Sequence, residues 1–251
     1  MSVPLRQSPI IAGVDGSVTA LNAVRWAAQE AARRHAPLRL VHVSYLVPEP
    51  TGQVPGDLDV LIERLRQWLT DAADVAKAAG DSIEITTELR HGTVAKAFIE
   101  ESVSARLIVL GQRGLEELSD LLLGSVPAAV AAHASCPVVV VHRSTLDSVP
   151  PVDGPVVVDV DGSTHGDAAV GFAIDAASLR AVPLVAALPT VNDSERLAGW
   201  REKYPDVEVR SVLVHGRHAL LDVAREAQLL VVGSASHALL QHAPCPIAVV
   251  R

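Results

Sequence analysis

The chain has 251 residues, of which 49% are hydrophobic and only 3% aromatic, and its formal net charge is −8. This length suits one large domain or two of average size, with cores built from Val, Leu, Ile and Ala. The acidic balance argues against nucleic acid or an anionic membrane surface as main partner. There is no long apolar run, no signal-peptide layout at the start and no disulfide framework, so we expect a soluble, cytoplasmic protein.

Short apolar runs alternate with stretches of helical periodicity along the first 143 residues. The runs are rich in β-branched residues, which is typical of strands buried on both faces of a sheet. The predicted strands are Ile10–Val14, Leu38–Val43, Ile83–Leu89, Leu107–Leu110 and Val138–Val141. The predicted helices are Ala20–His35, Leu58–Ala79, Val94–Ser104 and Val126–His133. Ser17 or Thr19 can cap the first helix, and Gly80 closes the second.

A polar, Pro-rich stretch at Ser144–Pro155 is interpreted as a linker between domains at residues 1–143 and 156–251. Beyond the linker the same alternation returns. The predicted strands are Val156–Val160, Leu184–Leu188, Val207–Val214, Leu229–Val232 and Ile247–Val250. Alternating β and α elements imply right-handed crossovers, so the sequence predicts an α/β protein with two tandem, doubly wound, five-stranded parallel sheets.

The second half of the chain is a shortened copy of the first. The segment IIAGVDGSVTALNAV, from Ile10, recurs as VVVDVDGSTHGDAAV, from Val156, at an offset of 146 residues. LIVLG, ending at Gly111, recurs as LLVVG, ending at Gly233, at an offset of 122, and HASCPVVVV, from His133, recurs as HAPCPIAVV at an offset of 109. The falling offset predicts two deletions in the second copy, of about 24 residues before its fourth strand and about 13 after it.

Two segments of the first copy follow predicted strands at the sheet edge where open α/β sheets bind ligands. GVDGS follows the first strand, and GQRGLEELSDLLLGS runs from Gly111 to Ser125, where the last helix opens. Glycines let a backbone approach a ligand closely, and free N–H groups at a helix N-terminus bind anions. There is no Walker lysine and no GxGxxG pattern, which leaves phosphate charge to backbone amides and a divalent cation, while Arg113 either contacts phosphate or is solvated.

The first copy resembles the nucleotide-binding members of the universal stress protein family, whose G-x2-G-x9-G-[S/T] motif it matches from Gly111 to Ser125. LLLGSV, HASCPVVVV and VDGS supply matching context. The resemblance implies the adenine-nucleotide alpha hydrolase-like fold and a bound ATP, with Mg²⁺ as the accompanying cation. Asp15 would contact ribose or adenine, and Val43 would line the adenine pocket. The implied binding residues are Gly13, Asp15, Val43, Gly111, Arg113, Gly114, Gly124, Ser125 and Val126.

The second copy departs from this motif. Gly233 is followed by SASHALLQHAPCP, which lacks the second glycine and the Gly-Ser pair. Asp161 remains, but an Asp at a strand end is also kept for turn capping. We therefore expect one ATP per chain, in the first domain only. The resemblance further implies an intramolecular pseudo-dimer in which Val138–Val141 and Ile247–Val250 meet, and it leaves open a homodimer and regulatory protein partners.

The histidines and cysteines do not form a metal or catalytic pattern. His133 and Cys136 are three residues apart, but no second close pair completes a four-ligand site. Cys136 and Cys245 stand at the same point of both copies, which favours small, buried packing residues. His91 and His215 each precede a glycine at corresponding points, which predicts a turn shared by the two copies.

The sequence as a whole predicts an ATP-binding regulator or sensor of the stress response that is not an enzyme, or at most hydrolyses ATP weakly. There is no Ser-His-Asp spacing and no paired-carboxylate motif. Two alternatives remain open. One is an ATPase or nucleotidyl-transfer enzyme on this scaffold, and the other is a nucleotide-independent interaction module whose loop is a relic.

Overall fold

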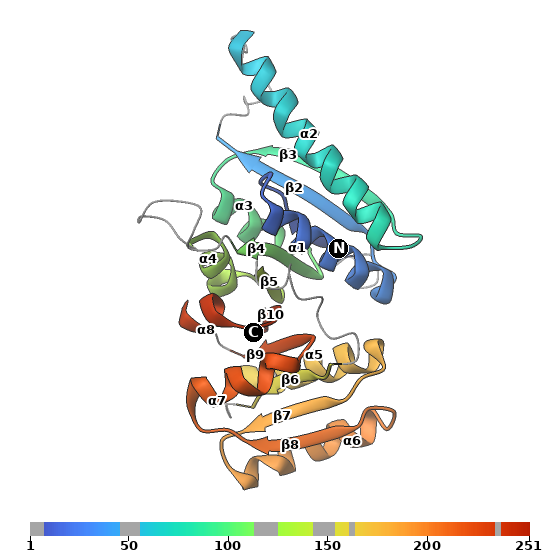
Figure 1. The fold of residues 1–251 in the computed structure, drawn as a ribbon, viewed down its shortest axis with the longest axis vertical. Helices are drawn as coiled ribbons and strands as arrows, with labels where there is room; N and C mark the ends of the chain where they lie inside the picture. Colours follow the sequence, from blue (N-terminus) through green and yellow to red (C-terminus); the bar gives the residue numbers. More distant parts are fainter. Residues whose placement is uncertain (1–7, 46–55, 113–124, 143–153, 161–163, 234–236) are drawn as a thin grey trace. The chain divides into compact units, whose positions relative to one another are not determined.

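The computed structural model describes residues 8–45, 56–112, 125–142, 154–160, 164–233 and 237–251. The chain divides into two compact units, Met1–Val141 and His142–Arg251 (Figure 1). The predicted linker falls largely outside the described residues, so its limits stay a prediction. The two units are described separately below.

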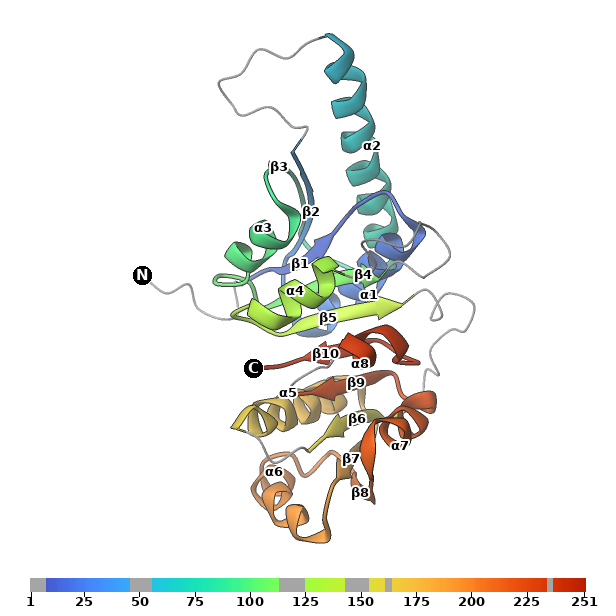
Figure 2. The ribbon, with the colours of Figure 1, turned by 90° about the vertical axis from the view of Figure 1, so that its left-hand side faces the viewer.

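The first unit alternates strands and helices as the sequence predicts. Its strands are β1 (Ile10–Gly13), β2 (Leu38–Ser44), β3 (Ile85–His91), β4 (Leu107–Gln112) and β5 (Val138–His142). Its helices are α1 (Val18–Arg34), α2 (Gly56–Ala79), α3 (Val94–Glu101) and α4 (Ser125–His133). The strand order is β3-β2-β1-β4-β5, and Figure 2 shows α1 and α2 on one face of the sheet with α3 and α4 on the other.

β1 lies at the centre of this sheet and sets the position of the site. It pairs in parallel with β2, where Ile10 lies opposite Leu38, and with β4, where Ile10 lies opposite Leu107. The chain first winds outward from β1 to β3 and then returns to the other side of β1 for β4. The strand order therefore reverses between β1 and β4, and ligands of open α/β sheets bind at such a reversal.

The ends of α1 are set by side-chain and backbone hydrogen bonds. The Ser17 hydroxyl accepts a hydrogen bond from the amide of Ala20 at 3.2 Å, so the helix begins two residues earlier than predicted, with Ser17 as its N-cap. At the other end His35 adopts a left-handed conformation with φ 48°, and the Ala36 amide donates to the Ala31 carbonyl at 3.0 Å. This closure is a Schellman motif without the usual glycine.

Gly80 follows α2 as predicted, but for a reason that lies in α1. A Cβ built on Gly80 would lie 2.7 Å from the carbonyl oxygen of Ala28, and the φ of Gly80 is not positive. The glycine therefore allows the end of α2 to pack closely against the backbone of α1, whereas a left-handed helix cap is not required there.

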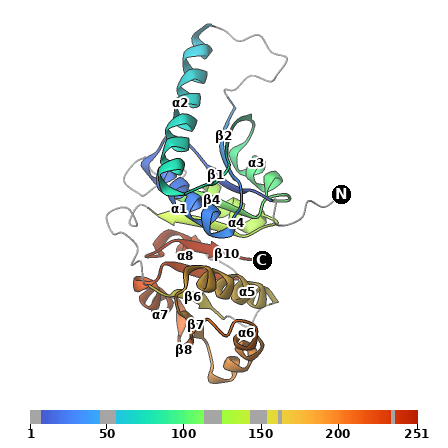
Figure 3. The same ribbon diagram turned by 90° about the vertical axis from the view of Figure 1, so that its right-hand side faces the viewer.

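The second unit repeats the architecture in shorter form. Its strands are β6 (Val156–Asp159), β7 (Leu184–Leu188), β8 (Val209–Leu213), β9 (Leu229–Val232) and β10 (Ile247–Val249). Its helices are α5 (Thr164–Arg180), α6 (Ala198–Lys203), α7 (Gly216–Val223) and α8 (His237–His242), with the 3-10 segments η3 (Val191–Leu197) and η4 (Ala224–Glu226). The order β8-β7-β6-β9-β10 matches the first unit strand for strand, with α5 and α6 on one face and α7 and α8 on the other (Figure 3). The predicted α/β class with two tandem parallel sheets is confirmed.

The first deletion shortens a helical segment, and the second falls mainly between the fourth strand and the helix that follows it. The 24-residue α2 of the first unit is replaced by η3, of seven residues, and α6, of six residues. The nine-residue α4 corresponds to an α8 of six residues. Within the described ranges no helix is both long and apolar enough to cross a membrane.

Candidate functional site

The reversal point of the first sheet brings two predicted segments to one edge. Asp15 lies two residues after the end of β1, and Gly111 is the last residue but one of the neighbouring strand β4. The strand β4 continues to Gln112, two residues beyond its predicted end. Four of the predicted ligand residues, Gly13, Asp15, Val43 and Gly111, therefore lie at or near the carboxyl ends of β1, β2 and β4.

Asp15 holds a tight turn between β1 and α1. Its Oδ1 atom accepts hydrogen bonds from the Ser17 amide at 3.0 Å and from the Ser17 hydroxyl at 2.6 Å. The same hydroxyl caps α1 through Ala20, so one chain of bonds connects the carboxylate with the first turn of the helix. Gly16, between them, has φ +78°, a conformation that side chains other than glycine rarely adopt. The carboxylate is thus held in one place at the sheet edge.

Trp68 of α2 covers this turn. A Cβ built on Gly16 would lie 2.4 Å from Cε2 of Trp68 and 2.6 Å from its Cδ2, so the indole packs directly against the Gly16 backbone. The Trp68 ring also meets the ring of His42 edge to face, with centroids 5.5 Å apart. Nδ1 of the buried His42 lies 2.7 Å from the Val14 carbonyl oxygen. Because a carbonyl can only accept, Nδ1 carries the proton and donates it.

Two glycines of the predicted site have packing roles of their own. A Cβ on Gly111 would lie 2.7 Å from both the carbonyl carbon and the oxygen of Thr19, in the first turn of α1. A Cβ on Gly13 would lie 2.7 Å from Cδ2 of Leu110 and 3.1 Å from Cζ of Phe98. These contacts account for both glycines without a ligand, and they also bring the N-terminal turn of α1 against the end of β4.

The remaining predicted residues divide into placed and unplaced ones. Val43 is 6% exposed in β2, and Ser125 and Val126 are the first two residues of α4, as the motif predicts. The other three residues, Arg113, Gly114 and Gly124, lie outside the described residues. The structure therefore brings Gly13, Asp15, Val43 and Gly111 to one edge and places Ser125 at a helix start, while their role in binding stays a prediction.

The corresponding edge of the second unit is shorter. Gly233 directly follows β9, and α8 begins only four residues later, at His237. In the first unit the segment between β4 and α4 spans residues 113–124. The second unit therefore has no room in the chain for the glycine pattern that the first unit carries.

Cys245 is buried, as predicted, whereas Cys136 is only half-buried. Burial raises the pKa of Cys136 and of Cys245 to about 12 in each case, well above the ordinary value for a thiol. Both thiols are therefore protonated near neutral pH and are poor nucleophiles. Nδ1 of His133 lies 2.9 Å from the Ala129 carbonyl of its own helix. The part of the chain that the structure describes contains no group of His, Cys, Asp and Glu side chains that could hold a metal ion.

The predicted shared turn is present in both units. Gly92 and Gly216, which follow His91 and His215, both have positive φ, at 141° and 82°. Nothing lies within 4 Å of a Cβ built on either glycine. Backbone conformation, not close packing, is therefore the reason for glycine at both points.

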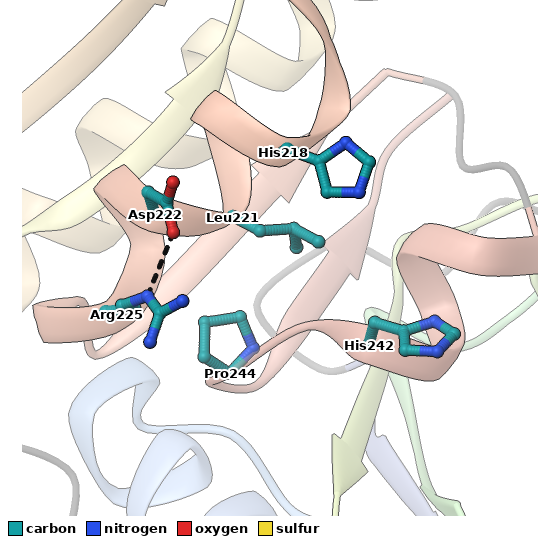
Figure 4. Close-up of a pocket in the computed structure, with 6 residues that line it drawn as sticks. All are labelled: His218, Leu221, Asp222, Arg225, His242 and Pro244. Atoms are coloured by element: carbon teal, nitrogen blue, oxygen red, sulfur yellow. Dashed lines mark hydrogen bonds and ion pairs between the residues drawn. The ribbon is translucent and has the colours of Figure 1, made fainter.

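An open cavity of about 490 Å³ is lined by residues of the second unit (Figure 4). It is lined by His218, Leu221, Asp222, Arg225, His242 and Pro244. Nε of Arg225 lies 3.0 Å from Oδ1 of Asp222, and both side chains are largely exposed. Because Asp222 offsets the charge of Arg225 at the surface, this cavity has no strong preference for an anion, and we do not assign it to nucleotide binding.

Sequence reasoning missed Trp68 as a neighbour of the site. The helix pattern of α2 identifies Trp68 as half-buried, but nothing local in the sequence indicates that it contacts a glycine more than fifty positions earlier. The available signal was the glycine at position 16 itself, because a residue without a side chain next to Asp15 leaves space that a large side chain can fill.

Comparisons with known proteins identify the family of this chain. The sequence matches the model of the universal stress protein family over residues 8–142. It is 35% identical to a universal stress protein of Mycobacterium tuberculosis over 293 aligned positions, covering 100% of this chain and 99% of the relative. It is 36% identical to one of Mycolicibacterium smegmatis, covering 96% of each chain. Since 293 positions exceed the 251 residues of this chain, the Mycobacterium tuberculosis relative carries residues without a counterpart here.

A solved structure agrees in fold. A universal stress protein from Archaeoglobus fulgidus matches with a TM-score of 0.70, over 96% of this chain and 97% of that chain, at 18% sequence identity. At this level of identity the likeness extends to the fold alone. It covers both units of this chain, and with them the reversal point between β1 and β4.

Proposed function

Because this chain belongs to the universal stress protein family, we propose that its first unit binds one ATP molecule and that the protein acts as a nucleotide-dependent regulator in the stress response. The observation that carries the proposal is the unbroken glycine motif from Gly111 to Ser125 at a sheet edge where the strand order reverses. The two ends of the motif are described, Gly111 in β4 and Ser125 at the start of α4.

The chemistry of this edge suits an adenine nucleotide. The N-terminus of α4 presents backbone N–H groups and the positive end of a helix dipole, which favour phosphate. The Asp15 carboxylate, held by Ser17, can accept hydrogen bonds from ribose hydroxyls. Val43 supplies an apolar wall for the adenine ring. Mg²⁺ would offset phosphate charge that amides and Arg113 leave unbalanced.

We propose binding without efficient turnover. A hydrolytic site needs a base within reach of the attacking water. The Asp15 carboxylate is already engaged with the Ser17 amide and hydroxyl, which favours a role in holding the turn and the ribose over proton transfer. The second unit, which lacks the glycine motif, would then serve as a structural or partner-binding domain.

Calorimetric titration with ATP tests the site, and the repeat supplies its control. Asp15→Ala is expected to weaken ATP binding at least about tenfold, since it removes a charged hydrogen-bond acceptor, whereas Asp161→Ala, at the equivalent point of the second unit, is expected to leave binding unchanged. Gly124→Glu should abolish binding through charge repulsion with phosphate. Equal affinity in wild type and Gly124→Glu would refute the pocket, and two ATP molecules per chain would refute the one-site proposal.

Two further measurements separate the alternatives. Denaturing the purified protein and identifying the released nucleotide by mass spectrometry shows which adenine nucleotide it carries. Protein-dependent release of ADP or pyrophosphate well above background would favour an enzyme over a regulator. Absence of both co-purified nucleotide and an ATP-induced shift in thermal unfolding would favour a nucleotide-independent interaction module.

We also propose the intramolecular pseudo-dimer, in which β5 and β10 pair through their apolar edges. Unpaired edges of apolar strands invite aggregation, so pairing would protect both. Hydrogen exchange tests this arrangement, because the amides on the outer sides of both strands should then exchange slowly. Fast exchange of alternate amides in β5 and β10 would contradict it.

A further inference from the structure

The turn that carries Asp15 is held from two sides by residues of other elements. On the side of α1, Ser17 connects the Asp15 carboxylate with the Ala20 amide. On the side of α2, Trp68 packs against Gly16, with Cε2 only 2.4 Å from where a Cβ would lie. Because Gly16 directly follows Asp15, the indole restricts the backbone conformations that this turn can adopt.

His42 extends this support to the residue before Asp15. Nδ1 of His42 donates to the Val14 carbonyl at 2.7 Å, and the Val14 amide donates to the Val41 carbonyl at 2.9 Å. The His42 ring in turn meets Trp68 at a centroid distance of 5.5 Å. Trp68 therefore contacts the residue after Asp15 directly and is connected through His42 to the residue before it.

The rest of α2 divides into a packed part and an exposed part. Buried residues recur at helical spacing through its second half, at Leu65, Leu69, Ala72 and Ala76. Toward the N-terminus Asp59 and Val60 are exposed, the valine at 73%. Trp68 is half-buried and lies between Leu65 and Leu69 in the packed part. Figure 2 shows the other end of α2 extending away from α1.

The second unit contains a matched tryptophan with a different neighbour. Trp200 of α6 packs against Gly171, in the middle of α5, where a Cβ would lie 2.7 Å from its Cη2 atom. Trp200 thus anchors α6 to α5 in place of the absent α2. In the first unit Trp68 packs against the turn at the sheet edge, whereas in the second unit Trp200 packs against the helix α5.

We propose that Trp68 is a positioning residue for the nucleotide site and that it couples nucleotide occupancy to α2. This inference rests on the proposed ATP site of the first unit. With the indole in place, the Asp15 carboxylate is held ready for the ribose before ATP arrives. Without it, the turn has more conformations, and the apparent affinity falls by the fraction of molecules that keep the binding geometry. Through the same contact, a change in the conformation of the turn on ATP binding would shift Trp68 and the part of α2 that carries it.

The test compares two tryptophan variants by calorimetry with ATP and by thermal unfolding. Trp68→Ala and Trp200→Ala should both lower the unfolding temperature, since each removes a large packing side chain. Only Trp68→Ala should raise the Kd for ATP, by about tenfold, as expected when one molecule in ten keeps the competent turn. Trp68→Phe should recover most of the affinity. Equal Kd values for Trp68→Ala and wild type, or equal losses in both alanine variants, would overturn the proposal.

A spectroscopic measurement tests the coupling. The chain contains three tryptophans, so the double variant Trp26→Phe/Trp200→Phe leaves Trp68 as the only one. ATP should change its emission wavelength or intensity with the same Kd that calorimetry gives. An emission spectrum that stays constant through saturation would refute the coupling to α2. If the wild-type chain does not bind ATP, the proposed function fails, and the role of Trp68 in it fails with it.

Discussion

Gly111 of β4 lies directly against the Thr19 carbonyl of α1, so closely that a Cβ on Gly111 would be 2.7 Å from both the carbon and the oxygen of that group. Real Cβ atoms do not approach backbone atoms at this distance, and both partners are held in regular secondary structure. The first glycine of the nucleotide motif is therefore required by the packing of α1 on the sheet, whether or not it also contacts a ligand.

Gly111→Ala should consequently destabilise the fold. Either α1 or the end of β4 has to shift to accept the methyl group, which typically costs about 1–3 kcal/mol. Urea unfolding followed by circular dichroism measures this change as a lower transition midpoint with an unchanged slope. Gly111 variants with weakened ATP binding therefore need a stability measurement before the loss is attributed to the ligand contact.

Gly199 provides the matched control. It lies in α6, and nothing is within 4 Å of a Cβ built on it. Gly199→Ala should leave stability unchanged or raise it by up to about 1 kcal/mol through higher helix propensity. If both alanine variants had the same stability, the close contact between Gly111 and Thr19 would not limit the choice of residue.

A second prediction concerns the end of α5. Ala181 has φ 52° after this helix, and His35 has φ 48° at the equivalent position after α1. The Val182 amide donates to the Ala177 carbonyl at 3.1 Å, the same bond that closes α1. A left-handed conformation costs a residue with a Cβ about 1–2 kcal/mol, and glycine avoids most of it. Ala181→Gly should therefore raise the free energy of unfolding by about 1 kcal/mol.

The control for this substitution lies in the same helix. Ala168 is exposed within α5, in ordinary helical conformation. Ala168→Gly should lower the free energy of unfolding by about 1 kcal/mol, because glycine has the lower helix propensity. Opposite signs for two identical substitutions in one helix would support the conformational explanation. A loss of stability in both variants would contradict it.

These examples show which parts of the structure the sequence could predict. Buried strands such as Leu184–Leu188 and Leu229–Val232 were predicted to the residue, because continuous β-branched and apolar runs distinguish strands covered on both faces. The start of α1 was misplaced by two residues because two neighbouring side chains, Ser17 and Thr19, were equally good caps by pattern. The doubly wound order followed from the alternation of elements.

The contacts at the sheet edge could not be predicted in this way. Glycine at positions 13 and 111 suggested close approach of a ligand, whereas the structure shows close approach of Leu110 and of Thr19. Trp68 reaches Gly16 across a long stretch of sequence, and local periodicity says nothing about such a pair. The predicted ligand residues Arg113, Gly114 and Gly124 lie outside the described residues. The prediction that these residues bind phosphate therefore still depends on the sequence motif alone.

A third prediction concerns a buried ion pair in α1. The Glu30 side chain is fully buried, and its Oε1 lies 2.5 Å from Nε of Arg34, which is 6% exposed. Glu30→Gln removes the negative charge and leaves a buried guanidinium beside a neutral amide, which should cost about 3 kcal/mol. The loss should persist in 1 M NaCl, because salt screens buried pairs weakly. Urea unfolding at low and high salt measures both effects.

An exposed pair supplies the comparison. Glu63 and Arg66 of α2 lie 3.6 Å apart with side chains 74% and 66% exposed. Glu63→Gln should change stability by less than about 0.5 kcal/mol, as for most surface pairs. Similar effects of the two substitutions would show that burial does not determine the contribution of the Glu30–Arg34 pair.

A fourth prediction concerns the two thiols. Burial raises the pKa of the half-buried Cys136 and of the buried Cys245 to about 12, so both thiols stay almost entirely protonated at pH 8 in the folded chain. A disulfide reagent such as DTNB should therefore react with the native protein far more slowly than with an exposed cysteine. In guanidinium chloride both thiols should react at once. Rapid modification of Cys245 in the native chain would contradict its burial, and rapid modification of Cys136 would contradict its raised pKa.

The same pKa shift predicts a dependence of stability on pH. The folded chain keeps its thiol protons where the unfolded chain, with thiols near the ordinary value of 9.0, loses them. The unfolded state therefore binds fewer protons above about pH 9, so the free energy of unfolding falls as pH rises from there toward about 12. The double variant Cys136→Ala/Cys245→Ala lacks this linkage, and its stability should fall less steeply than that of wild type between about pH 9 and 11. Parallel curves would show that other groups, and not the two thiols, cause the alkaline loss of stability.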